Sequence, residues 1–157
     1  MAPPTEVATM NDLERRDETL DRLNRLLRGE LAAVETYEQA LQKVSEDPVA
    51  SELRRILADH ETAVEKLKSE VVELGGEPSA SSGIWGSWAS LFEGTAKLFG
   101  PETAMRALRE GEKHGIGEYE AGLEDDYVGP HQKVLIRTEL LPQTHTHVQM
   151  LEQFIKA

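Results

Sequence analysis

The strongest constraint on the fold of this chain is that four of its segments carry apolar residues at helical spacing. Glycine or proline separates each segment from the next, and both residue types end helices. We therefore predict helices over about residues 10–45, 48–74, 101–126 and 130–156. Their apolar seams comprise Leu20, Leu23, Leu27, Val34 and Leu41 in the first segment, Leu53, Leu57, Val64, Leu67, Val71 and Leu74 in the second, Met105, Leu108, Ile116 and Leu123 in the third, and Leu140, Leu141, Val148, Leu151, Phe154 and Ile155 in the fourth.

The N-terminal residues 1–16 are expected to form a loose lead in front of the first helix. Thr9 and Asp12 have the spacing of a capping box, which would start the helix near Met10, whereas a break near Asp17 would start it later. The sequence leaves both starting points open.

Two prolines affect the later helices. Asp47 is expected to cap the second helix, with Pro48 at its first position. Pro142 lies inside the fourth helix, where it must kink the helix or free a carbonyl for another partner.

The connections between the helices predict how they pack. The first and third connections are short, so each flanking pair of helices should form an antiparallel hairpin. The middle connection, residues 75–100, is long enough to run the length of a bundle, and its second half has the apolar spacing of a short helix. These features predict an all-α four-helix bundle of up-down pairs with one long crossover. At this length we expect a single domain spanning residues 1–157.

Composition argues against several classes of function. The formal net charge of -12 disfavours nucleic-acid and anionic-membrane partners, which require basic surfaces. The chain has no cysteine, so disulfides and thiolate nucleophiles or metal ligands are excluded. It shows no secretory apolar segment and no apolar run of membrane-spanning length, so we expect a cytoplasmic protein. Because no hydrolase, kinase or nucleotide-binding motif occurs, we assign no enzymatic activity.

Four polar residues interrupt the apolar seams. Glu30 and Glu112 stand at seam positions of the first and third helices, where a dry face requires apolar residues. His60 and His147 stand on the seams of the second and fourth helices. Counting residues from the turns places the members of each pair within about 6 Å of the same depth, given the helical rise of about 1.5 Å per residue. We therefore predict that all four side chains share one layer of the core.

An internal repeat relates the first helix to the third. LLRGELAAVETYEQALQ (26–42) aligns without a gap on LREGEKHGIGEYEAGLE (108–124), and six of the 17 positions are identical. The identical positions include both seam glutamates and the tyrosine that follows each of them two helical turns later. This similarity indicates duplication of a helical hairpin, with the two glutamates at pseudo-symmetric positions.

The order Glu, His, Glu, His along four helices, with one long crossover, resembles the plan of the ferritin-like superfamily. Within that superfamily, the chain resembles bacterial four-helix proteins that carry a domain of unknown function. The resemblance covers about residues 17–157, and it implies a ferritin-like four-helix bundle. It rests on LNRLLRGE (23–30), ADHETAVEKLKSEVVELGGEP (58–78), the Gly/Ser–Trp crossover and REGEKHGIGEYEAGLE (109–124).

The resemblance is incomplete at the metal site. Ferritin-like di-iron sites use one Glu from each of two helices and a Glu-x-x-His motif from each of the other two. Here the residues three positions before His60 and His147 are Leu57 and Thr144, so both bridging carboxylates are missing. Glu61 adjoins His60, but it points about 100° away on a helix. The resemblance therefore implies the fold more strongly than it implies oxidase or iron-storage chemistry.

The quartet Glu30, His60, Glu112 and His147 leaves three interpretations open. It could hold a metal ion such as iron, manganese or zinc, for which carboxylates and imidazoles are suitable ligands. It could instead be a hydrogen-bonded network that fixes helix register, with the two seam tyrosines as further partners. In the third interpretation the seam rotates and the glutamates reach solvent.

Three functional hypotheses follow. The first is a non-catalytic bundle with a structural polar layer, which the family resemblance links to stress. The second is a metal-binding ferritin-like protein that uses the quartet as ligands. The third is a module that forms a homo-oligomer, or binds a protein partner, through crossover aromatics such as Trp85 and Trp88.

Overall fold

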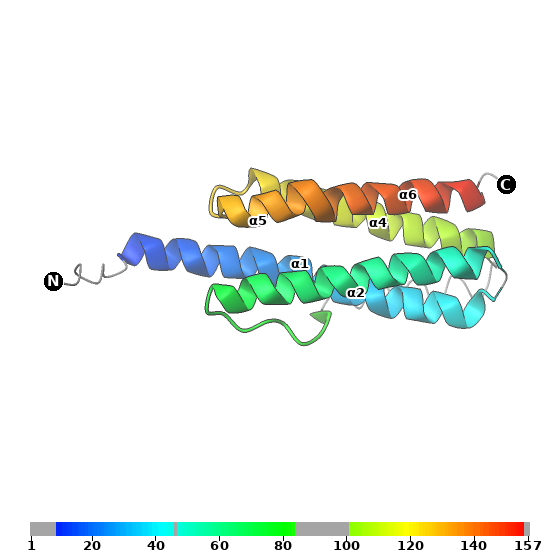
Figure 1. The fold of residues 1–157 in the computed structure, drawn as a ribbon, viewed down its shortest axis with the longest axis horizontal. Helices are drawn as coiled ribbons and strands as arrows, with labels where there is room; N and C mark the ends of the chain where they lie inside the picture. Colours follow the sequence, from blue (N-terminus) through cyan, green and yellow to red (C-terminus); the bar gives the residue numbers. More distant parts are fainter. Residues whose placement is uncertain (1–8, 46, 84–100, 156–157) are drawn as a thin grey trace.

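A computed structural model describes residues 9–45, 47–83 and 101–155 of the chain. Long helices account for most of these residues (Figure 1). They are α1 (Met10–Lys43), α2 (Val49–Glu73), α4 (Pro101–Glu124), α5 (Pro130–Leu135) and α6 (Leu141–Ile155), with a π-helical turn, η2 (Ile136–Leu140), joining the last two.

The helices form an all-α four-helix bundle, as predicted. α1 packs mainly against α2, and α4 packs mainly against α6, so the two short connections do join antiparallel hairpins (Figure 1). The segment from α5 through η2 to α6 forms the fourth helix of the bundle. None of the helices in the described ranges is long and apolar enough to cross a membrane.

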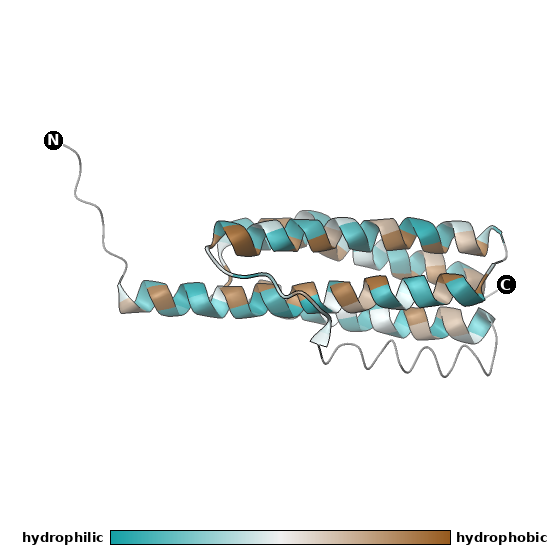
Figure 2. Ribbon diagram, turned by 90° about the horizontal axis from the view of Figure 1, so that it is seen from below, coloured by the Kyte–Doolittle hydropathy of each residue, from teal (hydrophilic) through white to brown (hydrophobic). Residues whose placement is uncertain are grey.

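The first helix begins at the earlier of its two predicted starts. The Asp12 N–H donates to Thr9 Oγ1 over 3.2 Å and the Thr9 N–H donates to Asp12 Oδ2 over 3.1 Å, which completes the capping box. Residues 10–16 are therefore helical and do not belong to a loose lead. This part of α1 extends past the ends of the other helices (Figure 2).

The predicted cap of the second helix is wrong. Pro48 occupies the N-cap position of α2, and no side chain caps this end, so Asp47 does not serve as the cap. The predicted stop is confirmed, because the N–H of Gly75 donates to Val72 and that of Gly76 donates to Val71. These two bonds make a Schellman motif, which requires the positive φ of 78° that Gly75 adopts.

The π-helical turn η2 shows how the fourth helix accommodates Pro142. The Leu141 N–H donates to the carbonyl of Ile136, five residues back, where an α-helix would bond four residues back. Pro142 follows as the second residue of α6 and has no N–H to donate. A wider turn in front of the proline lets the helix continue to Ile155.

Two apolar clusters fill the core. Tyr37 belongs to the cluster near the α1–α2 turn, and Tyr119 belongs to the cluster at the opposite end. The members of the first are Tyr37, Ala40, Val44, Leu53, Ile56, Ala104, Met105, Leu108, Leu151 and Ile155. The members of the second are Leu23, Leu26, Leu27, Ala63, Val64, Leu67, Val71, Tyr119, Ile136 and Leu140. Most seam residues predicted from the sequence are in these clusters or packed against them.

The crossover starts by running along α1. The Asn24 side chain donates to the carbonyl of Glu77 over 3.1 Å and accepts from the N–H of Ser79 over 2.8 Å. Further along, Ser82 donates to Glu35 over 3.0 Å. The predicted short helix and the crossover aromatics lie in residues 84–100, outside the described residues.

Candidate metal centre

The structure brings the four predicted site residues into one buried layer between the two apolar clusters. Glu30 comes from α1, His60 from α2, Glu112 from α4 and His147 from α6, so each helix of the bundle contributes one side chain. Their exposed fractions are 6%, 5%, 2% and 2%. The interpretation in which the glutamates turn toward solvent is therefore wrong.

His60 lies between the two glutamates. Its Nδ1 is 2.6 Å from Glu30 Oε2, and its Nε2 is 2.8 Å from Glu112 Oε1. A carboxylate only accepts hydrogen bonds, and a neutral imidazole has one N–H, so both contacts are satisfied together when His60 is an imidazolium. Burial lowers the pKa of His60, but the charges of Glu112 and Glu30 outweigh it and hold this pKa well above its usual value.

Glu112 is the most heavily bonded member of the layer. Burial raises the pKa of this carboxyl group, but the opposite effect of His60 and His147 is larger. The pKa of Glu112 therefore lies far below its usual range. Glu112 therefore remains ionised inside the core, where an unpaired charge would be very costly.

Each of the two seam tyrosines donates a hydrogen bond to the glutamate of the other repeat. Tyr37, on α1, donates to Glu112 Oε1 over 2.6 Å, and Tyr119, on α4, donates to Glu30 Oε1. Burial and the adjacent carboxylates hold the pKa of both phenols well above the usual value, so the hydroxyls stay protonated and act as donors. These two bonds agree with the interpretation in which the seam tyrosines are further partners of a hydrogen-bonded network.

His147 connects the layer to a residue that the sequence analysis missed. Its Nε2 lies 2.9 Å from Asp59 Oδ2, and its Nδ1 lies 3.4 Å from Glu112 Oε2. Because the Asp59 carboxylate accepts the hydrogen bond, Nε2 carries a proton. The sequence offered no clear signal for Asp59, because a residue next to His60 points about 100° away from it on a helix, as Glu61 does.

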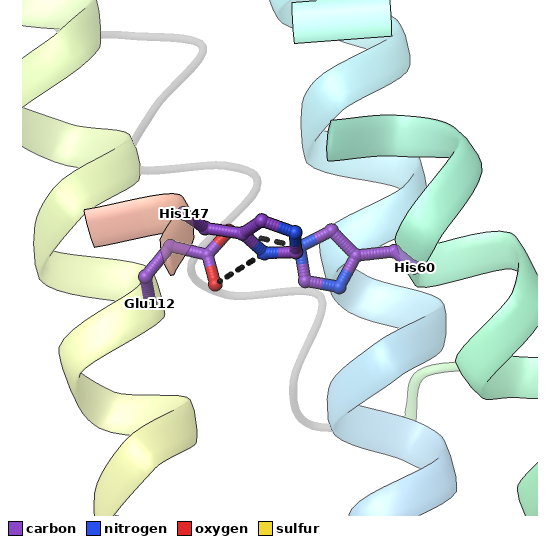
Figure 3. Close-up of side chains that lie close together, drawn as sticks. All are labelled: His60, Glu112 and His147. Atoms are coloured by element: carbon purple, nitrogen blue, oxygen red, sulfur yellow. Dashed lines mark hydrogen bonds and ion pairs between the residues drawn. The ribbon is translucent and has the colours of Figure 1, made fainter. Parts of the chain in front are cut away.

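Three of the four side chains are grouped closely enough to hold one ion. Ligand atoms of His60, Glu112 and His147 all lie within 4.8 Å of one another, and the three side chains point toward a common centre (Figure 3). A protein ligand atom lies about 2.0–2.2 Å from a bound zinc ion, so small side-chain movements would surround a single cation. Glu30 adjoins this group through His60.

The layer does not fit a carboxylate-bridged di-iron centre. Leu57, three positions before His60, packs against the apolar cluster near the α1–α2 turn. Thr144, three positions before His147, is buried, and its hydroxyl donates to the carbonyl of Leu140 over 2.8 Å. Neither position supplies the bridging carboxylate that such a centre needs.

A second group of possible ligands lies near the surface. Glu70, Glu73 and His131 meet where the end of α2 passes the start of α5, and His131 Nδ1 is 3.1 Å from Glu70 Oε2. Glu73 and His131 are exposed, and Gln132 also donates to Glu70. Exposed carboxylates of this kind are common without a bound ion, so the buried layer is the stronger candidate.

Two solved structures share this fold. One is a DPS protein from Vibrio cholerae O1, described as a member of a broad superfamily of ferritin-like diiron-carboxylate proteins. Its TM-score is 0.77 at 13% sequence identity, and the match covers 98% of this chain and 99% of that one. The other, from Bacillus anthracis str. Ames, is described as one of the ferritin-like, diiron-carboxylate proteins. Its TM-score is 0.72 at 16% sequence identity, and the match covers 90% of this chain and 97% of that one. At these identities the similarity establishes the fold alone.

The sequence itself matches a family. A search among curated proteins found no match. The family described as Domain of unknown function (DUF2383) matches residues 18–125, which include Glu30, His60 and Glu112. The chain therefore belongs to the DUF2383 family and has the ferritin-like fold.

Proposed function

We propose that this protein binds one divalent cation in its buried polar layer, with His60, Glu112 and His147 as the ligands and Glu30, the fourth predicted residue, accepting a hydrogen bond from His60 Nδ1. The observation that carries the proposal is the convergence of two imidazoles and one carboxylate from three helices, with ligand atoms within 4.8 Å of one another, in a buried layer between two apolar clusters. Carboxylate and imidazole ligands suit zinc, manganese and ferrous iron.

The charge of the layer supports the proposal. Without an ion, Glu30 and Glu112 both face His60, so two buried carboxylates share one imidazolium. When a divalent cation replaces the His60 proton on Nε2, the two positive charges of the ion balance the two carboxylates. A buried site with balanced charge is strongly favoured over one with an unpaired charge.

The donor set also defines the kind of site. Because Leu57 and Thr144 supply no bridging carboxylate, we propose a mononuclear site even though the two similar structures are described as diiron-carboxylate proteins. Asp59 accepts a hydrogen bond from His147 Nε2 and would orient that imidazole, as carboxylates behind metal-bound histidines do.

A second candidate function is an ion-free polar layer that fixes the register of the helices. The specific observation in its favour is that both nitrogens of His60 already have carboxylate partners at 2.6 and 2.8 Å. Buried polar groups can specify one packing arrangement at some cost in stability.

Metal titration tests the first candidate against the second. Chelator-treated protein is titrated with Zn²⁺, Mn²⁺ and Co²⁺ by calorimetry, and retained metal is counted by mass spectrometry after gel filtration. We expect one ion per chain, a higher melting temperature on loading, and a Co²⁺ absorption spectrum that reports imidazole ligands. Glu112→Gln should abolish tight binding, because it removes the ligand that contacts both histidines.

Two control variants identify the binding site. His131→Ala removes the imidazole of the exposed group and should leave tight binding unchanged. Glu61→Gln neutralises an exposed carboxylate beside His60 and should also leave it unchanged. If the wild type retains no ion under any loading condition, the metal proposal is wrong and the ion-free network is supported. Loss of the ion in His131→Ala would move the site to the surface.

A further inference from the structure

The buried layer has an approach from outside. A cavity of about 40 Å³ lies between α1 and α4 and ends on Glu30, His60, Glu112 and Tyr119. One water molecule needs roughly 10–15 Å³ of such space, so the cavity has room for about three. The carboxylates of the layer are therefore reachable by a small species that enters between these two helices.

Small residues make the walls of this cavity. Gly29 on α1 faces it, as do Gly111 and Gly115 on α4. A Cβ atom added to Gly29 would meet no atom within 4 Å, so alanine would fit there without a clash. Alanine would also favour the helix by about 0.5–1 kcal/mol over glycine. The space beside Gly29 is thus open, and a side chain at this position would fill it.

An ion pair crosses the outer rim of the cavity. Arg25 on α1 donates from Nε and Nη2 to the two carboxylate oxygens of Glu118 on α4, over 2.6 and 3.0 Å. The Arg25 side chain is 49% exposed and that of Glu118 is 17% exposed. Because the Arg25 side chain is half exposed, its guanidinium can move out into solvent and open the pair.

We propose that this cavity is the port through which the divalent cation reaches the buried layer, with Gly29 keeping it open and the Arg25–Glu118 pair closing its rim. This inference rests on the proposed function. A port changes the barrier between outside and inside in both directions, so narrowing it slows entry and exit equally. It therefore affects the rates of binding while leaving the equilibrium affinity unchanged.

Rapid-mixing kinetics of Co²⁺ uptake, and of release to a chelator, test the port. Gly29→Ala narrows the cavity by one methyl group and Gly29→Met fills more of it. We expect Gly29→Met to slow uptake and release by roughly tenfold or more, an increase of about 1.4 kcal/mol in the barrier, with Gly29→Ala intermediate and the dissociation constant unchanged. Gly117→Ala is the matched control, because its added Cβ also meets no atom within 4 Å but points away from the cavity.

The rim is tested in the opposite direction. Arg25→Gln removes the pair and should speed both uptake and release. Arg54→Gln, which removes the same charge from an exposed site on α2, controls for the general attraction of a more acidic protein. That attraction raises the uptake rate but not the release rate. Faster release in Arg25→Gln, with unchanged release in Arg54→Gln, would therefore show that the Arg25–Glu118 pair closes the port.

The outcomes separate this inference from the proposed function. If wild-type protein binds an ion at equilibrium but neither the Gly29 variants nor Arg25→Gln changes the rates, the port is wrong and the metal site stands. If wild-type protein binds no ion, the proposed function fails and the port fails with it. Circular dichroism establishes that each variant is folded, and Arg25→Gln still decides the question if a Gly29 variant is not.

Discussion

At the scale of single residues, Glu112 shows how a carboxylate becomes tolerable in a helical core. Tyr37, His60 and His147 all approach its two oxygens, and they come from three different helices. Glu30 is held by fewer partners, His60 and Tyr119. Removing one donor therefore leaves a buried carboxylate with an unpaired oxygen. The free-energy cost of that unpaired group exceeds the net stabilisation that one hydrogen bond contributes.

Tyr37→Phe tests this arrangement. The ring is fully buried and phenylalanine fills the same space, so the change removes only the hydroxyl that donates to Glu112. We expect a loss of about 1.5–3 kcal/mol in the free energy of unfolding, the usual value of a hydrogen bond to a charged group. Urea denaturation of chelator-treated protein measures it.

Tyr127→Phe provides the comparison for this prediction. Tyr127 is 46% exposed and lies outside the layer, so removal of its hydroxyl should change the free energy of unfolding by less than about 0.5 kcal/mol. Equal losses in the two variants would mean that the Tyr37 hydroxyl has no special role.

At the scale of helices, the same substitution has opposite effects at two glycines. Gly75 ends α2 with a φ of 78°, a conformation that costs other L-residues roughly 1–2 kcal/mol. Gly117 lies in the middle of α4, where it is exposed and a Cβ meets no neighbour. Gly75→Ala should therefore lower the free energy of unfolding by about 1 kcal/mol, and Gly117→Ala should raise it by about 0.5–1 kcal/mol.

Thermal and urea unfolding of the two variants decide this prediction. Gly76 is unsuitable as a further control, because a Cβ there would lie 2.4 Å from Leu20 Cδ2. If Gly75→Ala were neutral, the end of α2 would not depend on its left-handed residue. In that case the Schellman motif would be incidental to the stability of the hairpin.

Sequence patterns predicted the helices well, because each boundary signal acts locally. The capping box at Thr9 and the stop at Gly75 depend only on neighbouring residues. The assignment of Asp47 as a cap failed because Pro48 took the cap position itself. The sequence around Pro142 allowed either a kink or a freed carbonyl. The π-helical turn is the arrangement adopted when the fourth helix packs on the bundle.

At the scale of the whole molecule, the buried polar layer lies between the two apolar clusters of the core. His60 is faced by Glu30 from α1, by Glu112 from α4, and by the rings of Tyr37 and His147. The stability of the ion-free protein must therefore follow the charge state of this group of residues.

The pH dependence of unfolding follows from the two shifted groups. The pKa of His60 is raised in the folded protein, so its contribution is complete below 6.5 and is lost as pH rises toward the folded value. The pKa of Glu112 is lowered, so its contribution is complete above 4.5 and is lost as pH falls toward the folded value. With chelator present, we expect the free energy of unfolding to be greatest between about pH 4.5 and 6.5.

Urea denaturation across about pH 3 to 9, which covers this maximum and the decline on each side of it, checks the expectation. His60→Gln should flatten the decline on the alkaline side, whereas His114→Gln, an exposed histidine on α4, should not. A wild-type profile that keeps rising above pH 6.5 would show that His60 is not an imidazolium in the folded protein.

The sequence by itself determined the helices, their pairing and the depth at which Glu30, His60, Glu112 and His147 lie, because helical periodicity and turn position fix these features locally. Only the tertiary structure decided which atoms of the layer meet. The crossed tyrosine contacts, the Asp59–His147 bond and the cavity beside Gly29 depend on how four helices rotate against one another. That rotation is set by packing among all the helices at once, which no single segment encodes.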